Sequence, residues 1–334
     1  MPKIAILDEH NEDVGLKILF PECDYFIYKK RTCTQTDDIN RRYNITLRYD
    51  IENLNDKNYT HLFVITRPFN SYKIITETGV VHHNFLKDCH EFLSRTVNLI
   101  NNNNFEKVSM FCTDDVEVDP SKMVYNYFDI RKDITFFLRN YNRNKTYTPN
   151  VHPFPLLIFT SSNACSVDRV INMKHATIKS EKVFFAGNIY NKVDPLSGEF
   201  VNREDIIRDI RVKIPDLVHI HYGYIPNHIF MEQLGSFKYC LDLIGCGNPN
   251  IRTFEILGSG SLMISQRTNM KWHIEEPFAK ETYFTTVDEL KDVINRLNTD
   301  PVLYQKCLEQ QYTTVVKYMN KEYLRKYIED IVLV

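Results

Sequence analysis

Residues 237–265 decide the fold, and they read FKYCLDLIGCGNPNIRTFEILGSGSLMIS. Tyr239–Ile244 is an apolar run typical of a buried strand, and Ile251–Leu257 has the length and spacing of a short helix. A glycine-rich turn then leads into a second apolar run, Ser261–Ser265. The order strand, helix, strand predicts a parallel α/β unit.

The same alternation extends outward in both directions. Towards the N-terminus, apolar runs of strand type are predicted at four places, and the 3–4 spacing of apolar residues predicts a helix over His83–Asn101. These runs are Lys3–Leu7, His61–Thr66, Lys107–Thr113 and Leu156–Thr160. Around the first stretch, the expected elements are strands Lys182–Ala186 and Leu217–His221 and helices Arg203–Val212 and Val287–Leu297, with a further helix opened by Asp300-Pro301. The sequence therefore predicts two α/β domains.

Length and composition agree with two soluble domains. The 334 residues are 43% hydrophobic with a net charge of −2, which gives no electrostatic footprint for nucleic acid. No apolar run approaches the length of a membrane span, and the N-terminus lacks the features of a signal peptide, so we expect a cytoplasmic protein. Eight cysteines without a CxxC pair argue against a zinc ribbon and for free thiols.

Two nucleotide-binding motifs are missing. A Rossmann dehydrogenase needs GxGxxG after its first strand, where this chain reads DEHNEDVG, and no Walker A motif occurs. NAD-dependent and P-loop chemistry are therefore not expected.

The residues between the two strands of the first stretch suit an anion. Backbone N–H groups at a helix start attract phosphate, and Arg252 in the first helical turn adds a charged fork. Glu255 lies three residues later on the same helix face, where it can accept hydrogen bonds from a ribose diol. The alternative is that Arg252 and Glu255 merely pair with each other on a solvated helix, and the spacing favours neither.

This stretch resembles the donor-binding core of GT-B glycosyltransferases, especially exostosin-like enzymes. Their strand "KY-x-L-x-L-x-G", helix "R-x-x-E" and strand "G-S-L-x-I" match positions 238–264, and Phe184–Asn188 with Arg203–Ile207 resembles the opening of their C-terminal domain. The resemblance implies two Rossmann-like domains facing a cleft. It gives an acceptor-binding domain over 1–175, a donor-binding domain over 176–315, and a C-terminal helix over 316–334 that returns to the N-terminal domain.

Carried over to this chain, the resemblance implies that Arg252 contacts the donor diphosphate and Glu255 the ribose or sugar hydroxyls. Other donor-binding residues would be Gly187, Asn188, Arg203, Lys238, Asn248 and Asn250. In metal-free GT-B enzymes, basic side chains and a helix N-terminus stabilise the leaving diphosphate, so no metal and no cofactor are expected.

Retaining enzymes of this group often carry two glutamates eight positions apart, and here position 247, eight before Glu255, is a glycine. The sequence therefore favours inversion, which needs a general base. Two polar clusters follow predicted strands, Asp8-Glu9-His10 and Asp114-Asp115, and the candidate bases are Asp8, His10 and Asp115. Arg67, just past another strand, is a candidate for orienting an acceptor sugar.

The expected activity is transfer of a hexose or pentose from a nucleotide sugar, such as a UDP or GDP sugar, to a glycan hydroxyl. One alternative is a metal-dependent GT-A transferase that uses the acidic segment Asp115–Asp119. Another is a non-catalytic subunit that binds a sugar nucleotide or glycan. The partners are thus a nucleotide-sugar donor and a glycan, without nucleic acid or a membrane span.

Overall fold

The computed structural model divides the chain into two compact units. Unit 1 comprises Met1–Leu156 and Leu324–Val334, and unit 2 comprises Leu157–Tyr323. The structure describes residues 2–10, 15–29, 41, 44–51, 54, 58–68, 84–113, 118–154, 179–189, 191–193, 200–222, 225–245 and 251–333. The predicted strand Leu156–Thr160 lies outside these residues. Among the described helices, none combines the length and hydropathy needed to cross a bilayer.

Unit 1 is built on a seven-stranded parallel sheet in the order β3-β2-β1-β4-β5-β6-β7. Its strands are β1 (Ile4–Asp8), β2 (Asp24–Ile27), β3 (Leu47–Arg48), β4 (His61–Thr66), β5 (Lys107–Cys112), β6 (Thr135–Leu138) and β7 (Val151–Pro153). The helices are α1 (Gly15–Leu19), α4 (Asn84–Asn102), α5 (Pro120–Tyr127) and α12 (Lys321–Val332). The strand order reverses direction at β1 and β4, as in a doubly wound fold.

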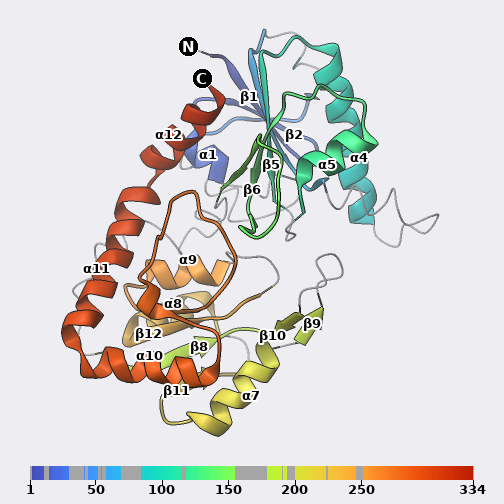
Figure 1. Ribbon diagram of the computed structural model, residues 1–334. Coiled ribbons are helices and arrows are strands. Elements are labelled where there is room, and N and C mark those ends of the chain that lie inside the picture. Colours follow the sequence, from blue (N-terminus) through green and yellow to red (C-terminus); the bar gives the residue numbers. More distant parts are fainter. Residues whose placement is uncertain are drawn as a thin grey trace. The chain divides into compact units, whose positions relative to one another are not determined.

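Helices cover both faces of this sheet. Figure 1 shows α4 and α5 on one side and α1 and α12 on the other. Ala5, Leu7 and Phe92 belong to the core on the α4 face. The opposite face carries a row of rings in which Phe111 stacks on Phe137 with centroids 4.6 Å apart and Tyr327 of α12 stacks on Phe154. Continuous apolar runs are expected where both faces are buried.

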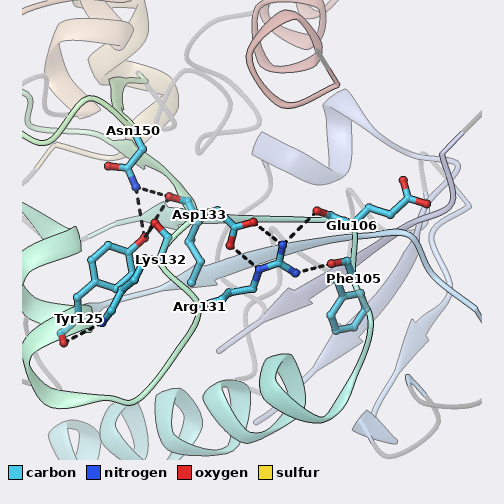
Figure 2. Close-up of polar contacts among 8 residues, drawn as sticks. Phe105, Glu106, Tyr125, Arg131, Lys132, Asp133 and Asn150 are labelled. Atoms are coloured by element: carbon cyan, nitrogen blue, oxygen red, sulfur yellow. Dashed lines mark hydrogen bonds and ion pairs between the residues drawn. The ribbon is translucent and has the colours of Figure 1, made fainter.

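An arginine joins the loops at the amino end of the β5 and β6 strands. In Figure 2, the Arg131 guanidinium donates to the backbone carbonyls of Phe105 and Glu106 and pairs with the carboxylate of Asp133. The Tyr125 hydroxyl beside it donates to the carbonyl of Lys132 at 3.0 Å. These contacts fix the edge of the sheet that lies away from the strands' carboxyl ends.

Unit 2 has a five-stranded parallel sheet in the order β11-β8-β12-β13-β14. Its strands are β8 (Ser180–Ala186), β11 (Val218–His221), β12 (Phe237–Asp242), β13 (Leu262–Gln266) and β14 (Tyr283–Phe284), beside a hairpin of β9 (Asn191–Val193) and β10 (Phe200–Asn202). Its helices are α7 (Arg203–Lys213), α8 (Asn227–Ser236), α9 (Ile251–Gly258), α10 (Val287–Thr299) and α11 (Pro301–Tyr318), with a 3₁₀ turn at Lys280–Thr282.

Alternate residues of β12 face different helices. Tyr239 and Leu241 belong to a core cluster that also holds Ile207 of α7 and Ile294 of α10. Cys240, between them, is fully buried and its thiol contacts the carbonyl of Leu234 in α8. The prediction of a two-domain α/β protein with Rossmann-like parallel sheets is confirmed.

A buried glutamine from α11 completes the backbone hydrogen bonding of β13. Gln311 is 4% exposed, its Oε1 accepts from the Met263 N–H at 2.8 Å, and its Nε2 donates to the Ser261 carbonyl at 2.8 Å. Removing both contacts would leave two buried backbone groups unsatisfied.

We therefore expect Gln311→Leu to lower the free energy of unfolding by about 2–4 kcal/mol, because each orphaned group costs about 1–3 kcal/mol. The matched control is Gln305→Leu, since Gln305 is exposed and its amide donates to the Glu309 side chain at 2.8 Å. Urea unfolding of both variants measures the difference. Equal stability of the two variants would contradict this role for Gln311.

Candidate donor-binding and catalytic sites

The candidate donor site of unit 2 lies at the carboxyl edge of its sheet, where β8, β12 and β13 end. In a parallel sheet, these ends meet the N-termini of the following helices, here α7 and α9. The hairpin of β9 and β10 lies in the chain between β8 and α7. The turn after α9 contains Gly260 at φ +73°, a backbone conformation that glycine adopts without strain.

Arg252 and Glu255 lie on one face of α9, as their spacing predicts. Arg252 Nη1 is 2.8 Å from Glu255 Oε2, and the guanidinium stacks on Phe230 of α8 with its carbon 3.8 Å from the ring centroid. Both side chains are partly buried, with 29% and 12% exposed. A guanidinium has five N–H donors and a carboxylate two oxygens, so this pair occupies only part of each group.

Arg203, the first residue of α7, bridges two strand ends. Its Nη1 donates to the carbonyl of Asn188 at 3.0 Å and its Nη2 to the carbonyl of Leu243 at 2.9 Å. Asn188 and Gly187 follow β8 and are exposed. A Cβ built on Gly187 would lie 3.9 Å from Arg203 Nη1, so the Gly187 backbone lies beside this guanidinium.

Gln266, the last residue of β13, holds the same edge together. Its Oε1 accepts from the Ile244 N–H at 3.1 Å, and its Nε2 donates to Asn202 Oδ1 at 3.5 Å. The side chain thus joins the loop after β12 to the start of α7.

Asp242 is a site residue that sequence reasoning did not single out. It is 8% exposed, and its Oδ2 accepts from Thr253 Oγ1 of α9 at 3.0 Å. Burial raises the pKa of this carboxyl to about 6, against the opposing effects of the Thr253 hydrogen bond and the charges of Arg203 and Arg252. The signal available in the sequence was its place as a carboxylate at the end of a buried strand.

Lys238 is not brought together with Arg252. It is the second residue of β12, four residues before Asp242 and so about 13 Å away along the strand. Its Nζ lies 3.9 Å from Glu181 Oε1 and 4.5 Å from the ring centroid of Tyr304. The predicted phosphate contact does not fit this position at the strand's amino end. Asn248 and Asn250 lie outside the described residues.

In unit 1, the polar cluster after β1 is buried. Asp8, Glu9 and His10 are 2%, 3% and 2% exposed. Asp8 has internal partners, because its Oδ1 accepts from the His10 N–H at 3.1 Å and its Oδ2 lies 3.9 Å from the Nζ of buried Lys17. This arrangement fits a turn-forming residue and a counter-charge for Lys17.

Glu9 and His10 form a dyad. His10 Nε2 is 2.8 Å from Glu9 Oε1, and the Arg67 N–H donates to Glu9 Oε2 at 3.2 Å. The two carboxylate oxygens thus hold the imidazole on one side and the backbone after β4 on the other. The Arg67 side chain turns to Thr113, with Nε 3.4 Å from Oγ1. The other candidate base, Asp115, lies outside the described residues, together with Asp114.

The described residues also bring together one group of side chains of metal-ligating types, namely Glu9, His10 and Cys89 of α4. One ligand atom from each lies within 4.8 Å of the others, and all three residues are buried. Imidazole, thiolate and carboxylate are ligands that Zn²⁺ accepts. In this structure, the Glu9 and His10 atoms lie at hydrogen-bonding distance from each other, so a metal would have to separate them. The expectation of a metal-free enzyme remains a prediction.

Comparison with known proteins supports a sugar-transferring enzyme fold for the part of the chain that holds the candidate donor site. Residues 203–328 match the model of a family described as glycosyl transferase-like. They span the chain from Arg203 at the start of α7 into α12 and include Asp242, Arg252 and Glu255. The chain therefore has the fold of GT-B glycosyltransferases, and its residues 203–328 match a glycosyl transferase-like family. The comparison with curated proteins finds no match.

Solved structures show the same fold over the full chain. The T4 phage enzyme BGT in complex with UDP-glucose has a TM-score of 0.53 at 15% identity, covering 99% of each chain. A glycosyltransferase from Rickettsia africae has a TM-score of 0.54 at 10% identity, covering 99% of this chain and 98% of that one. A structure described as the DNA modifying enzyme beta-glucosyltransferase has a TM-score of 0.52 at 14% identity, covering 99% of each chain. The GT-B prediction is confirmed, whereas nothing distinguishes an exostosin-like member.

The raised pKa of Asp242 makes the stability of the protein depend on pH. Its ordinary pKa is about 3.9, so the unfolded chain loses this proton at a lower pH than the folded chain, whose pKa is about 6. The stability conferred by the protonated carboxyl is complete below about pH 4 and is lost as the pH rises through 6. At pH 7 the buried charge costs about 3 kcal/mol, from 1.36 kcal/mol per pKa unit.

We expect Asp242→Asn to raise the free energy of unfolding by about 1–3 kcal/mol at pH 7 and to change it little at pH 4, because the amide removes only the buried charge. Asp119→Asn is the control, since the Asp119 carboxylate caps α5 by accepting from the N–H groups of Ser121 and Thr148. That variant should be destabilised at both pH values. A loss of stability in Asp242→Asn at pH 7 would contradict the burial argument.

Proposed function

We propose that the enzyme transfers a sugar from a nucleotide-sugar donor, with UDP-glucose the first to test, to a glycan hydroxyl, with inversion and without a metal cofactor. The observation that carries this proposal is the α9 arrangement, in which Arg252 stacks on Phe230 and pairs with Glu255 at the carboxyl edge of the sheet. We choose UDP as the nucleotide to test because the T4 phage enzyme of the same fold is in complex with UDP-glucose.

The donor would bind through unit 2. Arg252 would contact the diphosphate with the guanidinium nitrogens that Glu255 does not use, and Glu255 would accept from ribose or sugar hydroxyls. Arg203, fixed by the carbonyls of Asn188 and Leu243, would add a second positive charge. As the bond to the anomeric carbon breaks, negative charge grows on the leaving diphosphate, and preorganised cations stabilise it without a metal ion.

The acceptor would be activated in unit 1. We assign the general base to His10, because Glu9 Oε1 lies 2.8 Å from its Nε2 and a carboxylate at that distance would favour the tautomer with the proton on Nε2. An Nε2–H donated to Glu9 leaves Nδ1 as the basic nitrogen, which would take the proton of the acceptor hydroxyl during attack on the anomeric carbon. Arg67 and its backbone would orient this dyad and the acceptor.

The assay combines the purified enzyme with UDP-glucose and either an oligosaccharide mixture or duplex DNA, each with and without EDTA. We expect UDP release with saccharides that EDTA does not abolish. Transfer to DNA alone would contradict the acceptor proposed here, and it has to be tested because one enzyme of the same fold is described as DNA modifying. Activity lost in EDTA and restored by Mn²⁺ or Zn²⁺ would contradict the metal-free mechanism.

Arg252→Ala should weaken UDP binding about 10–100-fold, because a hydrogen bond to a charged group contributes about 1.5–3 kcal/mol and 1.4 kcal/mol corresponds to a factor of ten. The control is Arg208→Ala, since Arg208 forms a similar pair with Asp205 at 2.7 Å on the exposed face of α7. Isothermal titration calorimetry measures both dissociation constants. Equal affinities in the two variants would exclude Arg252 from the donor site.

His10→Ala should lower kcat about 10²–10⁴-fold, the usual contribution of general base catalysis, while leaving the dissociation constant of UDP unchanged. Glu9→Gln should lower kcat less and shift its pH profile, because it acts through His10. His61→Ala is the control, since His61 is also buried in unit 1 but begins β4 at the opposite end of the strand. Normal turnover in His10→Ala would show that another residue is the general base.

A further inference from the structure

A single carboxylate connects three elements of the donor site. Asp242 ends β12, and its Oδ2 accepts from Thr253 Oγ1 of α9 at 3.0 Å and from Ser265 Oγ of β13 at 3.4 Å. Its side chain is therefore hydrogen-bonded to α9, the helix that carries Arg252 and Glu255.

The other carboxylate oxygen has no such support. Oδ1 is buried, and among the described residues no group donates a hydrogen bond to it. Asp242 also lines a cavity of about 30 Å³, with Thr253, Ser265, Trp272 and Phe278 in its wall. A buried oxygen without a donor disfavours the charged form of a carboxylate, and the apolar rings add to this effect.

Two cations oppose that effect. The charges of Arg203 in α7 and Arg252 in α9 both lower the pKa of Asp242, whereas burial raises it. The other ionisable side chain of the cavity wall is Tyr283 of β14. The nearby carboxylate of Glu255 is paired with Arg252 and is not part of that wall. The ionised state of Asp242 thus depends on the same two arginines that are proposed to bind the donor.

We propose that Asp242 is a positioning residue of the donor site that is ionised in the free enzyme and takes up one proton from solvent when the donor diphosphate engages Arg203 and Arg252. The inference rests on the proposed donor function. The diphosphate brings two negative charges to the arginines, so the field that stabilised the carboxylate is cancelled. The carboxylate is buried, so it gains a proton, and the charge balance of the site is restored.

Proton uptake and donor binding are then linked in both directions. If donor binding raises the proton affinity of Asp242, a bound proton raises the affinity for the donor by the same factor. Donor affinity should increase as the pH falls towards 6, by at most tenfold per pH unit for one proton. Release of the nucleoside diphosphate would return the proton to solvent and restore the ionised carboxylate.

The experiment is calorimetric titration with UDP-glucose, whose diphosphate diester carries the same charge from pH 5 to 8. Titrations at pH 7 in two buffers of different ionisation enthalpy give the number of protons taken up. We expect wild-type uptake approaching one proton, and an affinity that falls at least threefold between pH 6 and pH 8. Asp242→Asn should take up none and should bind equally well at both pH values.

Two further variants test whether Asp242 is the group that takes up the proton. His221→Ala removes the imidazole at the end of β11, on the same edge of the sheet, and should leave proton uptake unchanged. Thr253→Val removes the hydrogen bond to Oδ2 and should move the pH of half-maximal uptake upward, which provides a test if Asp242→Asn does not fold. Binding of UDP-glucose without proton uptake, or uptake that persists in Asp242→Asn, would overturn this inference alone. Absence of UDP-glucose binding at every pH would overturn the proposed donor function as well.

Discussion

The hydrogen bond from Thr253 to Asp242 fixes α9 at the end of β12, and the candidate donor groups depend on that placement. Phe254, one residue later, is fully buried and packs edge-on against Trp272, with ring centroids 6.0 Å apart. With these two contacts in place, Arg252 emerges over Phe230 and meets Glu255 one turn further on. A polar contact and an apolar one thus orient a helix of only eight residues so that its charged face remains at the carboxyl edge of the sheet.

The sequence predicts this part of the fold well because its signals are local. The apolar runs of β12 and β13 and the spacing of Arg252 and Glu255 need no information from elsewhere in the chain. Short strands such as β2 and β6 escaped prediction, since three apolar or aromatic residues in a row do not separate strand from helix. Helix α8 was missed as well, although it supplies Phe230.

Other features depend on contacts that a single sequence does not reveal. Asp242 becomes unusual only when Thr253 and Ser265, 11 and 23 residues away, close over it. Lys238 resembled a phosphate ligand by motif, but the direction of β12 puts it at the wrong end of the strand. Glu9 and His10 are neighbours whose pairing requires the turn after β1, which Asp8 and the Arg67 backbone help to hold.

Identity of 10–15% over nearly whole chains means that the fold is retained while most side chains differ. The chemistry of this enzyme therefore has to be argued from its own residues. In unit 2 these are the guanidiniums of Arg203 and Arg252 and the buried carboxylate of Asp242, and in unit 1 they are the Glu9–His10 dyad.

The most direct test of the donor site is hydrogen–deuterium exchange of the whole protein with and without UDP-glucose. We expect slower exchange in α9 and in the residues that follow β8 and β12, because a diphosphate held by Arg252 and Arg203 would order these backbones together. Exchange that slows only in unit 1, or in α10 and α11 without α9, would contradict the assignment of the donor to the carboxyl edge of the unit 2 sheet.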